Sequence, residues 1–393
     1  MRILFLHEVS YEDKPIFEMH EFPEHMAFRG HEVFFLDFRE GKSGRGFSVQ
    51  REVIKGRVLS GIRVKLTTLA PNINGLTGRL IAALLFPIIF IRELKRIKPD
   101  IVVCYAVPTM GWQAVIISRL ARIPFVFRAL DVSHRIRKTV VWPAVFVAEV
   151  VTYSLANFVA ANNLALLRYC QKLGARPSRS CVVLPPLDHG NFSPNRESGK
   201  SRGKRNSESK KSVILYMGSF FYFSGLKQVL ESLPSLPSNI ELWLIGGGEQ
   251  EALLRSTVEK LGLKDQVDFK GFVDYKILMQ YFAKADVAIN PMERSAVSNL
   301  ALPNKVLQYM SASVPVVSTR LDGLEKTLGA APGLFFVDNP EQVMDRVNEI
   351  LHRSDLYQLG QLNGQHVRSK FSLEESVGSF EMVLVRAGAS RDE

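Results

Sequence analysis

Glycines and hydroxyl side chains follow two strand-like runs in the second half of the chain. Tyr216–Gly225 (YMGSFFYFSG) opens a helix after one run, and Leu244–Gly248 (LIGGG) ends the other run in three glycines. Glycine lets the backbone turn tightly and approach a ligand closely, while hydroxyls and helix N-terminal amides can face an anion. A plain tight turn is the alternative for the second motif. The candidate anion-binding residues are Gly218, Ser219, Ser224, Gly225, Gly246 and Gly248.

A cation lies at the start of a helix predicted after Pro303. The sequence PNKVLQYM places Lys305 and Gln308 three residues apart, hence on one face of that helix. Proline fits the first turn of a helix, so this face lies near the positive end of the helix dipole.

These motifs would lie close together if the strands that precede them belong to one parallel sheet, because the turns after parallel strands meet at its carboxyl edge. Strand-like apolar runs alternate with helix-length segments, which is typical of parallel sheets buried on both faces. We therefore predict the α/β class, with two successive doubly wound domains. The predicted strands are Ile3–Leu6, His31–Leu36, Asp100–Tyr105, Pro124–Ala129, Phe158–Ala161, Val213–Met217, Ile240–Ile245, Val267–Phe269, Val287–Asn290 and Val314–Thr319.

The charge divides the chain in the same way. The formal net charge is +11; residues 1–195 carry 26 Lys and Arg against 15 Asp and Glu, whereas residues 212–371 carry 15 against 17. Between these domains lies 196–211, rich in Ser, Gly and basic residues, which can bury no apolar surface and is predicted to be a flexible linker. Residues 372–393 are predicted to form a C-terminal helix that packs back on the first domain.

The composition indicates an ordinary globular protein of a reducing compartment. Hydrophobic residues make up 46% and charged residues 23%, which excludes a disordered or collagen-like chain. The three cysteines form no CxxC pair or zinc pattern. The apolar run of the N-terminal MRILFLHE is too short for a signal peptide. Thr139–Asn162 carries one charge, Glu149, and is long enough to span a membrane, but a helix end near Ser154 followed by a strand favours a buried helix.

Motifs along the whole chain carry a resemblance. In the first half they are Gly30–Val33 (GHEV), Lys98–Val102 (KPDIV), Asn157–Ala161 (NFVAA) and Pro186–Pro194 (PLDHGNFSP). In the second half they are the glycine loop, IGGG, VDFKG, ADV, PNKVLQYM and VPVVST. In this order they resemble the GT-B glycosyltransferases and, more narrowly, the retaining glycosyltransferase family 4 (glycosyl transferases group 1).

The resemblance implies two Rossmann-like domains with parallel sheets facing across a cleft, the acceptor on the first and a nucleotide-sugar on the second. Cations and helix N-termini would meet the charge that grows on the leaving diphosphate, and neither a metal nor another cofactor is expected. The implied donor-binding residues are Gly271, Phe272 and Val273 near the base, Gln308 at the ribose, and Gly218 with Arg294, Asn299, Leu302 and Lys305 around the diphosphate.

Four side chains depart from the family pattern, the last two at the positions of two glutamates eight residues apart: Ser219, Ser224, Leu300 and Gln308. Ser219 and Ser224 stand where the family usually has Arg and Lys aimed at the diphosphate. Lys305 and Arg294 are the candidates for compensation. Leu300 stands where the family has the first of two glutamates. A GT-B-fold binding or partner subunit with weak or no transferase activity is therefore the alternative to an active enzyme.

The first domain supplies the candidate catalytic groups. Phe125–Asp131 (FVFRALD) is similar to the strand that ends in the family's cleft-facing Asp, which makes Asp131 the matching residue. A helix N-cap holding the Ser133 region is the alternative for Asp131. His134 is a second catalytic candidate. The first loop, His7–Lys14, lacks the family's glycines.

The excess of basic residues in the first domain suggests that this domain binds an anionic partner. Arg92–Lys98 and Arg135–Lys138 lie beside apolar segments, a combination that suits docking on anionic lipid. We expect a cytoplasmic glycosyltransferase, peripheral on the inner face of a membrane, that moves a sugar from a nucleotide-sugar to a glycan or lipid-linked acceptor. A solvated basic face is the alternative. No nucleic-acid partner is expected, because the basic segments lack interleaved aromatic residues.

Overall fold

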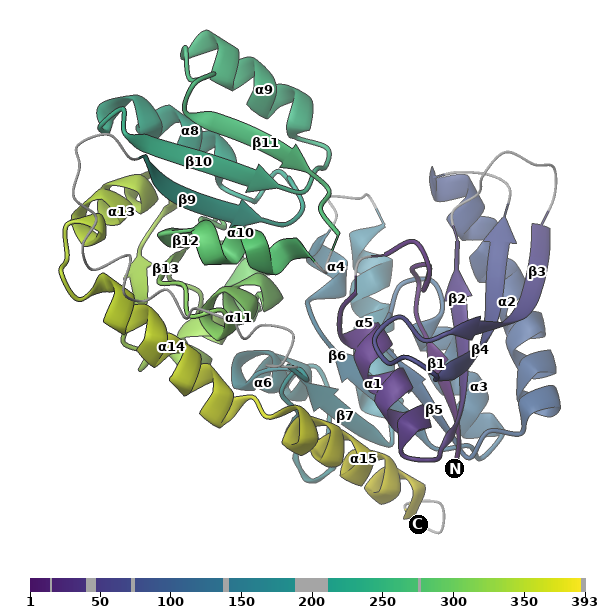
Figure 1. The fold of residues 1–393 in the computed structure, drawn as a ribbon. Helices are drawn as coiled ribbons and strands as arrows, with labels where there is room; N and C mark the ends of the chain where they lie inside the picture. Colours follow the sequence, from purple (N-terminus) through teal and green to yellow (C-terminus); the bar gives the residue numbers. More distant parts are fainter. Residues whose placement is uncertain are drawn as a thin grey trace. The chain divides into compact units, whose positions relative to one another are not determined.

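The computed structural model describes residues 1–14, 16–39, 47–71, 75–136, 141–187, 211–274 and 277–389. The chain divides into two units: unit 1 is Met1–Pro186 with Leu373–Glu393, and unit 2 is Leu187–Ser372 (Figure 1). The predicted linker 196–211 lies outside the described residues, apart from Lys211. Within the described ranges, no helix is both long and apolar enough to cross a membrane.

Unit 1 is built on an eight-stranded sheet in the order β3-β4-β2-β1-β5-β6-β7-β8. All neighbouring strands run parallel except the pair β3 and β4. The chain winds outward from β1 on one side and from β5 on the other, so the topological switch point lies between these two strands. The strands are β1 Arg2–Leu6, β2 Glu32–Phe38, β3 Phe47–Lys55, β4 Arg63–Pro71, β5 Ile101–Cys104, β6 Phe125–Ala129, β7 Phe158–Ala161 and β8 Ser180–Val182.

Helices cover both faces of this sheet. On one face Phe22 of α1 stacks on Phe380 of α15, with ring centroids 4.2 Å apart, and both belong to a core that includes Leu66 of β4. The next residue, Thr67, points to the opposite face, where its hydroxyl lies 3.5 Å from Glu93 of α2. The helices of unit 1 are α1 Glu18–Phe28, α2 Gly75–Ile97, α3 Gly111–Leu120, α4 Ser133–Ile136, α5 Trp142–Leu155, α6 Leu164–Lys172 and α15 Leu373–Ala389.

Unit 2 has a six-stranded sheet, entirely parallel, in the order β11-β10-β9-β12-β13-β14. Its switch point lies between β9 and β12, where ligands bind in open α/β sheets. The strands are β9 Ser212–Met217, β10 Ile240–Ile245, β11 Val267–Gly271, β12 Val287–Asn290, β13 Val316–Thr319 and β14 Leu334–Val337. The helices are α8 Leu226–Ser232, α9 Glu251–Lys260, α10 Leu278–Lys284, α11 Asn304–Ser311, α12 Asp322–Leu328, α13 Val343–Leu351 and α14 Leu356–Lys370.

The two-domain α/β fold expected from the sequence is confirmed, and four strands add to those predicted: β3, β4, β8 and β14. No strand is predicted at 47–71, where β3 and β4 form an antiparallel pair at the sheet edge. Most of β3 is exposed or half-buried, so it carries no continuous apolar run that would signal a strand.

Candidate functional site

The loops that follow β9 and β12 meet at the switch point of unit 2. The amide of Glu293, after β12, donates to the carbonyl of Phe223, after β9, at 2.9 Å. Gly225 begins α8 with φ of +72°, and a Cβ added to it would lie 1.7 Å from the carbonyl oxygen of Pro291. Only glycine fits this contact, so the end of the first glycine motif is fixed by the packing of the two loops.

The two glycine motifs also pack against each other. A Cβ added to Gly246 would lie 2.1 Å from the carbonyl oxygen of Gly218, and one added to Gly248 would lie 2.8 Å from the amide of Phe220. Gly218 and Gly246 have φ of +140° and +122°, which L side chains rarely adopt. Bare backbone from both turns therefore forms one continuous edge, as the spacing of the motifs predicted.

Lys305 lies at this edge, one residue into α11. Its Nζ donates to the Tyr216 hydroxyl at 3.1 Å and sits 4.2 Å from the centroid of the Tyr216 ring. The same Nζ is 3.2 Å from the position of a Cβ on Gly218. Burial lowers the pKa of Lys305 to about 7. A cation beside a bare glycine turn is suited to hold a phosphate group.

Two tyrosines that the sequence analysis did not select support this cation. The Tyr309 hydroxyl accepts the amide of Met217 at 2.6 Å, and the Tyr216 hydroxyl donates to the carbonyl of Ser219 at 3.0 Å. Tyr309 follows Lys305 by four residues, so it lies on the same face of α11. That helical spacing was the available signal for Tyr309.

The remaining residues of the first motif and of the base region differ in exposure. Ser219 is exposed, whereas Ser224 is 5% exposed. Phe272 is 80% exposed, and its ring lies 3.0 Å from the position of a Cβ on Gly247. Gly271 has φ of +65° and Val273 is half-buried. The Gly271–Val273 segment therefore lies against the second glycine motif, at the same edge of the sheet.

Three predicted donor-binding residues lie in the loop before α11, two in structural contacts and one exposed to solvent. The Asn299 side chain accepts the amide of Asp322 at 3.1 Å, at the start of α12, and Leu302 is 4% exposed. Arg294 is exposed, and its charge helps to lower the pKa of Asp322 after the larger effect of Lys326. Of the candidates in this loop, Arg294 alone presents a charged group to solvent.

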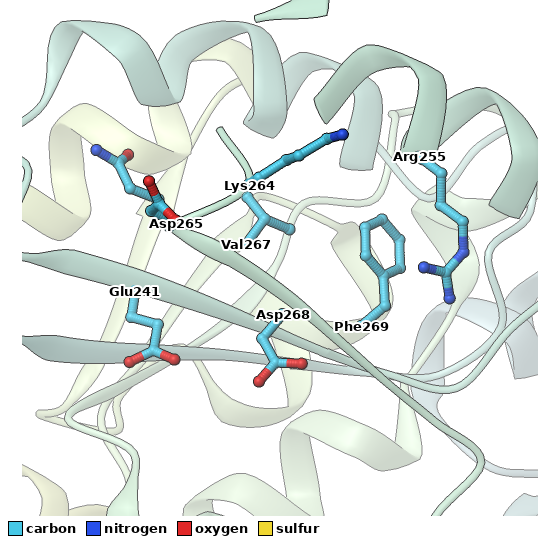
Figure 2. Close-up of a pocket in the computed structure, with 8 residues that line it drawn as sticks. Glu241, Arg255, Lys264, Asp265, Val267, Asp268 and Phe269 are labelled. Carbon is cyan, nitrogen blue, oxygen red and sulfur yellow. The ribbon is translucent and has the colours of Figure 1, made fainter. Parts of the chain in front are cut away.

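A shallow hollow in unit 2 lies elsewhere, beside the edge strand β11. Figure 2 shows Arg255 next to the ring of Phe269, and the guanidinium lies 4.3 Å from the ring centroid. The lining residues are Glu241, Arg255, Lys264, Asp265, Gln266, Val267, Asp268 and Phe269. None of the predicted donor-binding residues lines this hollow.

In unit 1, Asp131 lies two residues beyond β6 and is exposed. Desolvation, followed by the charge of Glu149, raises the pKa of Asp131 to about 6. The amide of Ser133 donates to Glu149 at 2.6 Å, so Glu149 fills the capping role that was the alternative for Asp131. Asp131 is therefore not needed as the cap of this turn, and it lies at the carboxyl edge of the sheet.

Glu149 also holds His134. Its Oε2 lies 2.6 Å from His134 Nδ1 and accepts the Tyr169 hydroxyl at 2.9 Å. His134 is 6% exposed and Glu149 is fully buried. The structure therefore assigns His134 to a buried polar network beside Asp131. Glu149 was missed as a site residue, although it is the single charge in the apolar stretch Thr139–Asn162.

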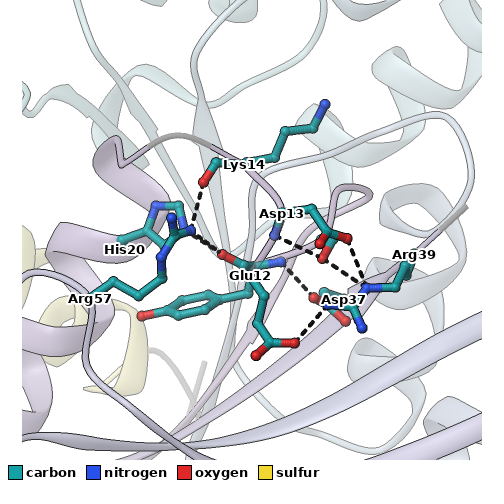
Figure 3. A network of polar contacts seen from close by, with 9 residues as sticks. Glu12, Asp13, Lys14, His20, Asp37, Arg39 and Arg57 are labelled. Atoms are coloured by element: carbon teal, nitrogen blue, oxygen red, sulfur yellow. Dashed lines mark hydrogen bonds and ion pairs between the residues drawn. The ribbon is translucent and has the colours of Figure 1, made fainter. Parts of the chain in front are cut away.

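The loop after β1 is fixed by side chains instead of glycines. Asp37 of β2 accepts the Tyr11 amide at 2.6 Å, while Arg57 and His20 bind the Tyr11 carbonyl oxygen, each at 2.7 Å (Figure 3). Desolvation raises the pKa of Asp37 to about 6 and lowers that of His20 to about 4. At neutral pH His20 is therefore uncharged, and its Nε2 lies within hydrogen-bond distance of the Tyr11 carbonyl oxygen.

Across the described parts of both units, no three His, Cys, Asp or Glu side chains gather as metal ligands would.

Comparisons with known proteins agree with this architecture. A family model described as "Glycosyl transferases group 1" matches residues 197–364. The lipopolysaccharide core biosynthesis glycosyltransferase LpsE of Rhizobium meliloti is 30% identical over 122 residues, which are 31% of this chain and 34% of LpsE. The chain thus matches about a third of the length of this curated relative.

Solved structures match over nearly the whole chain. Sucrose-phosphate synthase from Thermosynechococcus elongatus superposes with a TM-score of 0.78 and 14% identity, covering 99% of both chains. Anabaena HepE, solved with UDP and glucose, gives a TM-score of 0.73 at 17% identity, covering 98% of this chain and 99% of HepE. Residues 197–364 therefore match the glycosyl transferases group 1 family, within a chain whose fold is the GT-B fold of these solved structures.

Proposed function

We propose that the protein is a glycosyltransferase that binds a nucleotide-sugar on unit 2 and transfers the sugar to a glycan or lipid-linked acceptor bound on unit 1. The observation that carries this proposal is Lys305, whose Nζ lies at the Gly218 turn beside bare backbone. HepE was solved with UDP and glucose, and LpsE is named for lipopolysaccharide core biosynthesis. Both support a nucleotide-sugar donor and a cell-envelope acceptor here.

The proposed chemistry follows from where charge grows. As the bond between the sugar and the diphosphate breaks, negative charge accumulates on the leaving diphosphate oxygens. The Lys305 ammonium and the backbone amides around Gly218 would stabilise that charge without a metal. The pKa of Lys305 without ligand is about 7, and the negative charge of a bound diphosphate would raise it and keep the ammonium group protonated. We propose retention of configuration, on the resemblance of the ordered motifs to the retaining family.

The charge of unit 1 supports the proposed location. Its excess of Lys and Arg suits the anionic inner face of a cytoplasmic membrane, where lipid-linked acceptors are presented. The three cysteines form no CxxC pair, which suits a reducing compartment. We propose a peripheral enzyme of that surface, with no nucleic-acid partner.

A binding subunit with weak or no activity remains the second candidate. Ser219 and Ser224 carry no charge, and Leu300 offers no hydrogen bond to a sugar hydroxyl. We propose that Lys305 compensates for one of the missing cations, which favours the active enzyme.

A thermal-shift screen tests the donor site. The full chain should unfold at a higher temperature with one class among UDP-, GDP- and dTDP-sugars, because ligands that bind only the folded state stabilise it. A panel in which no nucleotide-sugar raises the unfolding temperature would favour the binding subunit.

The ribose contact gives a milder prediction. Gln308 is half-buried on α11, three residues after Lys305. Gln308→Ala should weaken donor binding by about 1–3 kcal/mol, the cost of losing a partly buried hydrogen bond. Calorimetric titration with the donor measures the change, and Gln361→Ala, at a half-buried position of α14, is the matched control. Equal affinity in the wild type and Gln308→Ala would remove Gln308 from the donor site.

A further inference from the structure

One side of α2 is apolar and faces solvent. Leu80, Leu84, Ile88 and Ile91 are exposed by 54%, 76%, 54% and 42%. Their spacing of four, four and three residues places them along one side of the helix. Single exposed aliphatic residues are ordinary on a protein surface, whereas a continuous stripe along one helix marks an interaction surface. We call these four residues the α2 stripe.

The opposite side of α2 is already packed. Ala82, Phe86 and Phe90 have no exposed surface, and the Phe86 and Phe90 rings stack with centroids 5.1 Å apart. Glu93 is buried on the same side, next to Thr67 of β4. The fold of unit 1 therefore uses the inward side of α2, and the α2 stripe is a second apolar face that this packing does not need.

Cations follow the α2 stripe at the end of the helix. Arg92, Lys95 and Lys98 are all exposed. Trp112 of α3 is 39% exposed. It lies near the middle of α2, since the side chain of the next residue, Gln113, donates to the carbonyl of Ala83 at 3.0 Å. An aliphatic stripe with flanking cations and an exposed indole is typical of a helix that lies in the plane of a membrane interface.

We propose that the α2 stripe docks this protein on an anionic lipid bilayer, with Leu80, Leu84 and Ile88 in the boundary between headgroups and acyl chains and Arg92 and Lys95 on the headgroups. The proposal deepens the proposed function, because it rests on a lipid-linked acceptor as the reason for docking. Charge favours a bilayer over a second copy of the chain. A copy of a protein with a net charge of +11 brings more positive charge, whereas anionic headgroups bring the opposite sign.

The test is co-sedimentation of the full chain with vesicles of phosphatidylglycerol and phosphatidylcholine, and with pure phosphatidylcholine. The wild type should bind the anionic vesicles, weakly at high salt, and bind pure phosphatidylcholine poorly. Leu84→Asp should lower the partition coefficient about tenfold or more, because it removes the most exposed apolar side chain of the α2 stripe and adds a repelled charge.

Leu253→Asp is the matched control, since Leu253 is 46% exposed on α9 of unit 2. This control should bind vesicles as the wild type does, and both variants should unfold at the wild-type temperature because both sites are already exposed. Wild-type protein that ignores anionic vesicles, or equal losses in both variants, would overturn the proposal. A wild-type dimer that Leu84→Asp converts to a monomer, without vesicle binding, would assign the α2 stripe to a second copy and also overturn it.

Nucleotide-sugar binding in the same preparations separates this surface from the donor site. Vesicle binding without nucleotide-sugar binding would leave the α2 stripe standing and remove the donor assignment. Nucleotide-sugar binding without vesicle binding would do the reverse.

Discussion

Lys305→Met is expected to lower kcat/KM for the donor by about 10²–10³-fold, the range seen when one preorganised charge-stabilising donor is removed. The Nζ of Lys305 is held by the Tyr216 hydroxyl at 3.1 Å, so it is positioned before the ligand arrives. Methionine keeps the length of the side chain and removes the charge. The effect should therefore fall on donor binding and turnover, with little change in the fold.

The pH dependence of donor binding is a second test of the Lys305 ammonium group. The unliganded pKa of Lys305 is lowered to about 7 by burial, and a bound diphosphate favours the charged form. Donor affinity should therefore fall as pH rises above about 7, by up to tenfold per pH unit while protonated Lys305 is required. Lys305→Arg should keep affinity flat over this range, since a guanidinium stays charged.

The control for charge is Lys260→Met, which removes an exposed cation from α9 of the same unit. It should leave kcat/KM and the pH profile unchanged. If Lys305→Met bound and used the donor as well as Lys260→Met does, the phosphate contact assigned to Lys305 would be wrong.

The meeting of the glycine turns at one edge of unit 2 could be predicted because each turn is local in sequence and the topology is regular. Each glycine motif follows a strand-like run, and in a parallel sheet all such turns meet at the carboxyl edge. The contact of Gly246 with Gly218 joins two motifs that the sequence shows only as separate turns. What the sequence did not show was that Lys305 reaches back to Gly218, because that depends on how α11 packs on β9.

Unit 1 was less predictable for a physical reason. The role of Glu149 depends on a turn 15 residues away, where it accepts the His134 side chain and the Ser133 amide. Its sequence context is a single acid in an apolar helix, which signals a buried charge but not its partner. The sequence predicts a C-terminal helix that packs on the first domain, but the residues that it contacts, such as Phe22 of α1 against Phe380, appear only in the fold.

Boundaries were the least accurate feature. Proline fits the first turn of a helix, so Pro23 signals a helix start in the sequence, whereas α1 begins at Glu18 and contains Pro23. The charges explain this extension. Glu18 is buried and bound to Arg128 of β6, a contact between distant segments that local helix signals do not include.

Asp131→Asn should lower turnover by about 10²–10⁴-fold, the usual contribution of a positioned acid or base, while donor affinity stays near the wild-type value. The substitution keeps the shape of the side chain and removes its ability to ionise. Donor affinity should be spared, because the predicted donor residues belong to unit 2 and Asp131 to unit 1. Steady-state kinetics with varied donor, combined with calorimetric binding of the donor, separates the two quantities.

The pH dependence of kcat tests whether the ionised form of Asp131 is the active one. Because the pKa of Asp131 is raised to about 6, wild-type kcat should rise with pH through about 6 and level off above it. Asp131→Asn should lose that step. The exposed carboxylate substitution Glu52→Gln on β3 should keep both kcat and the step. A wild-type kcat in Asp131→Asn would remove Asp131 from the catalytic site.

A loss of stability cannot explain a loss of turnover in Asp131→Asn, because the raised pKa of Asp131 predicts a variant at least as stable as the wild type at neutral pH. A carboxyl group whose folded pKa lies above its unfolded value favours the protonated form in the folded state, so at neutral pH its ionisation opposes folding. Asparagine mimics the protonated form and removes that opposition. Asp131→Asn should therefore unfold at the wild-type temperature or above it at neutral pH, and a loss of turnover in so stable a variant would be a loss of chemistry.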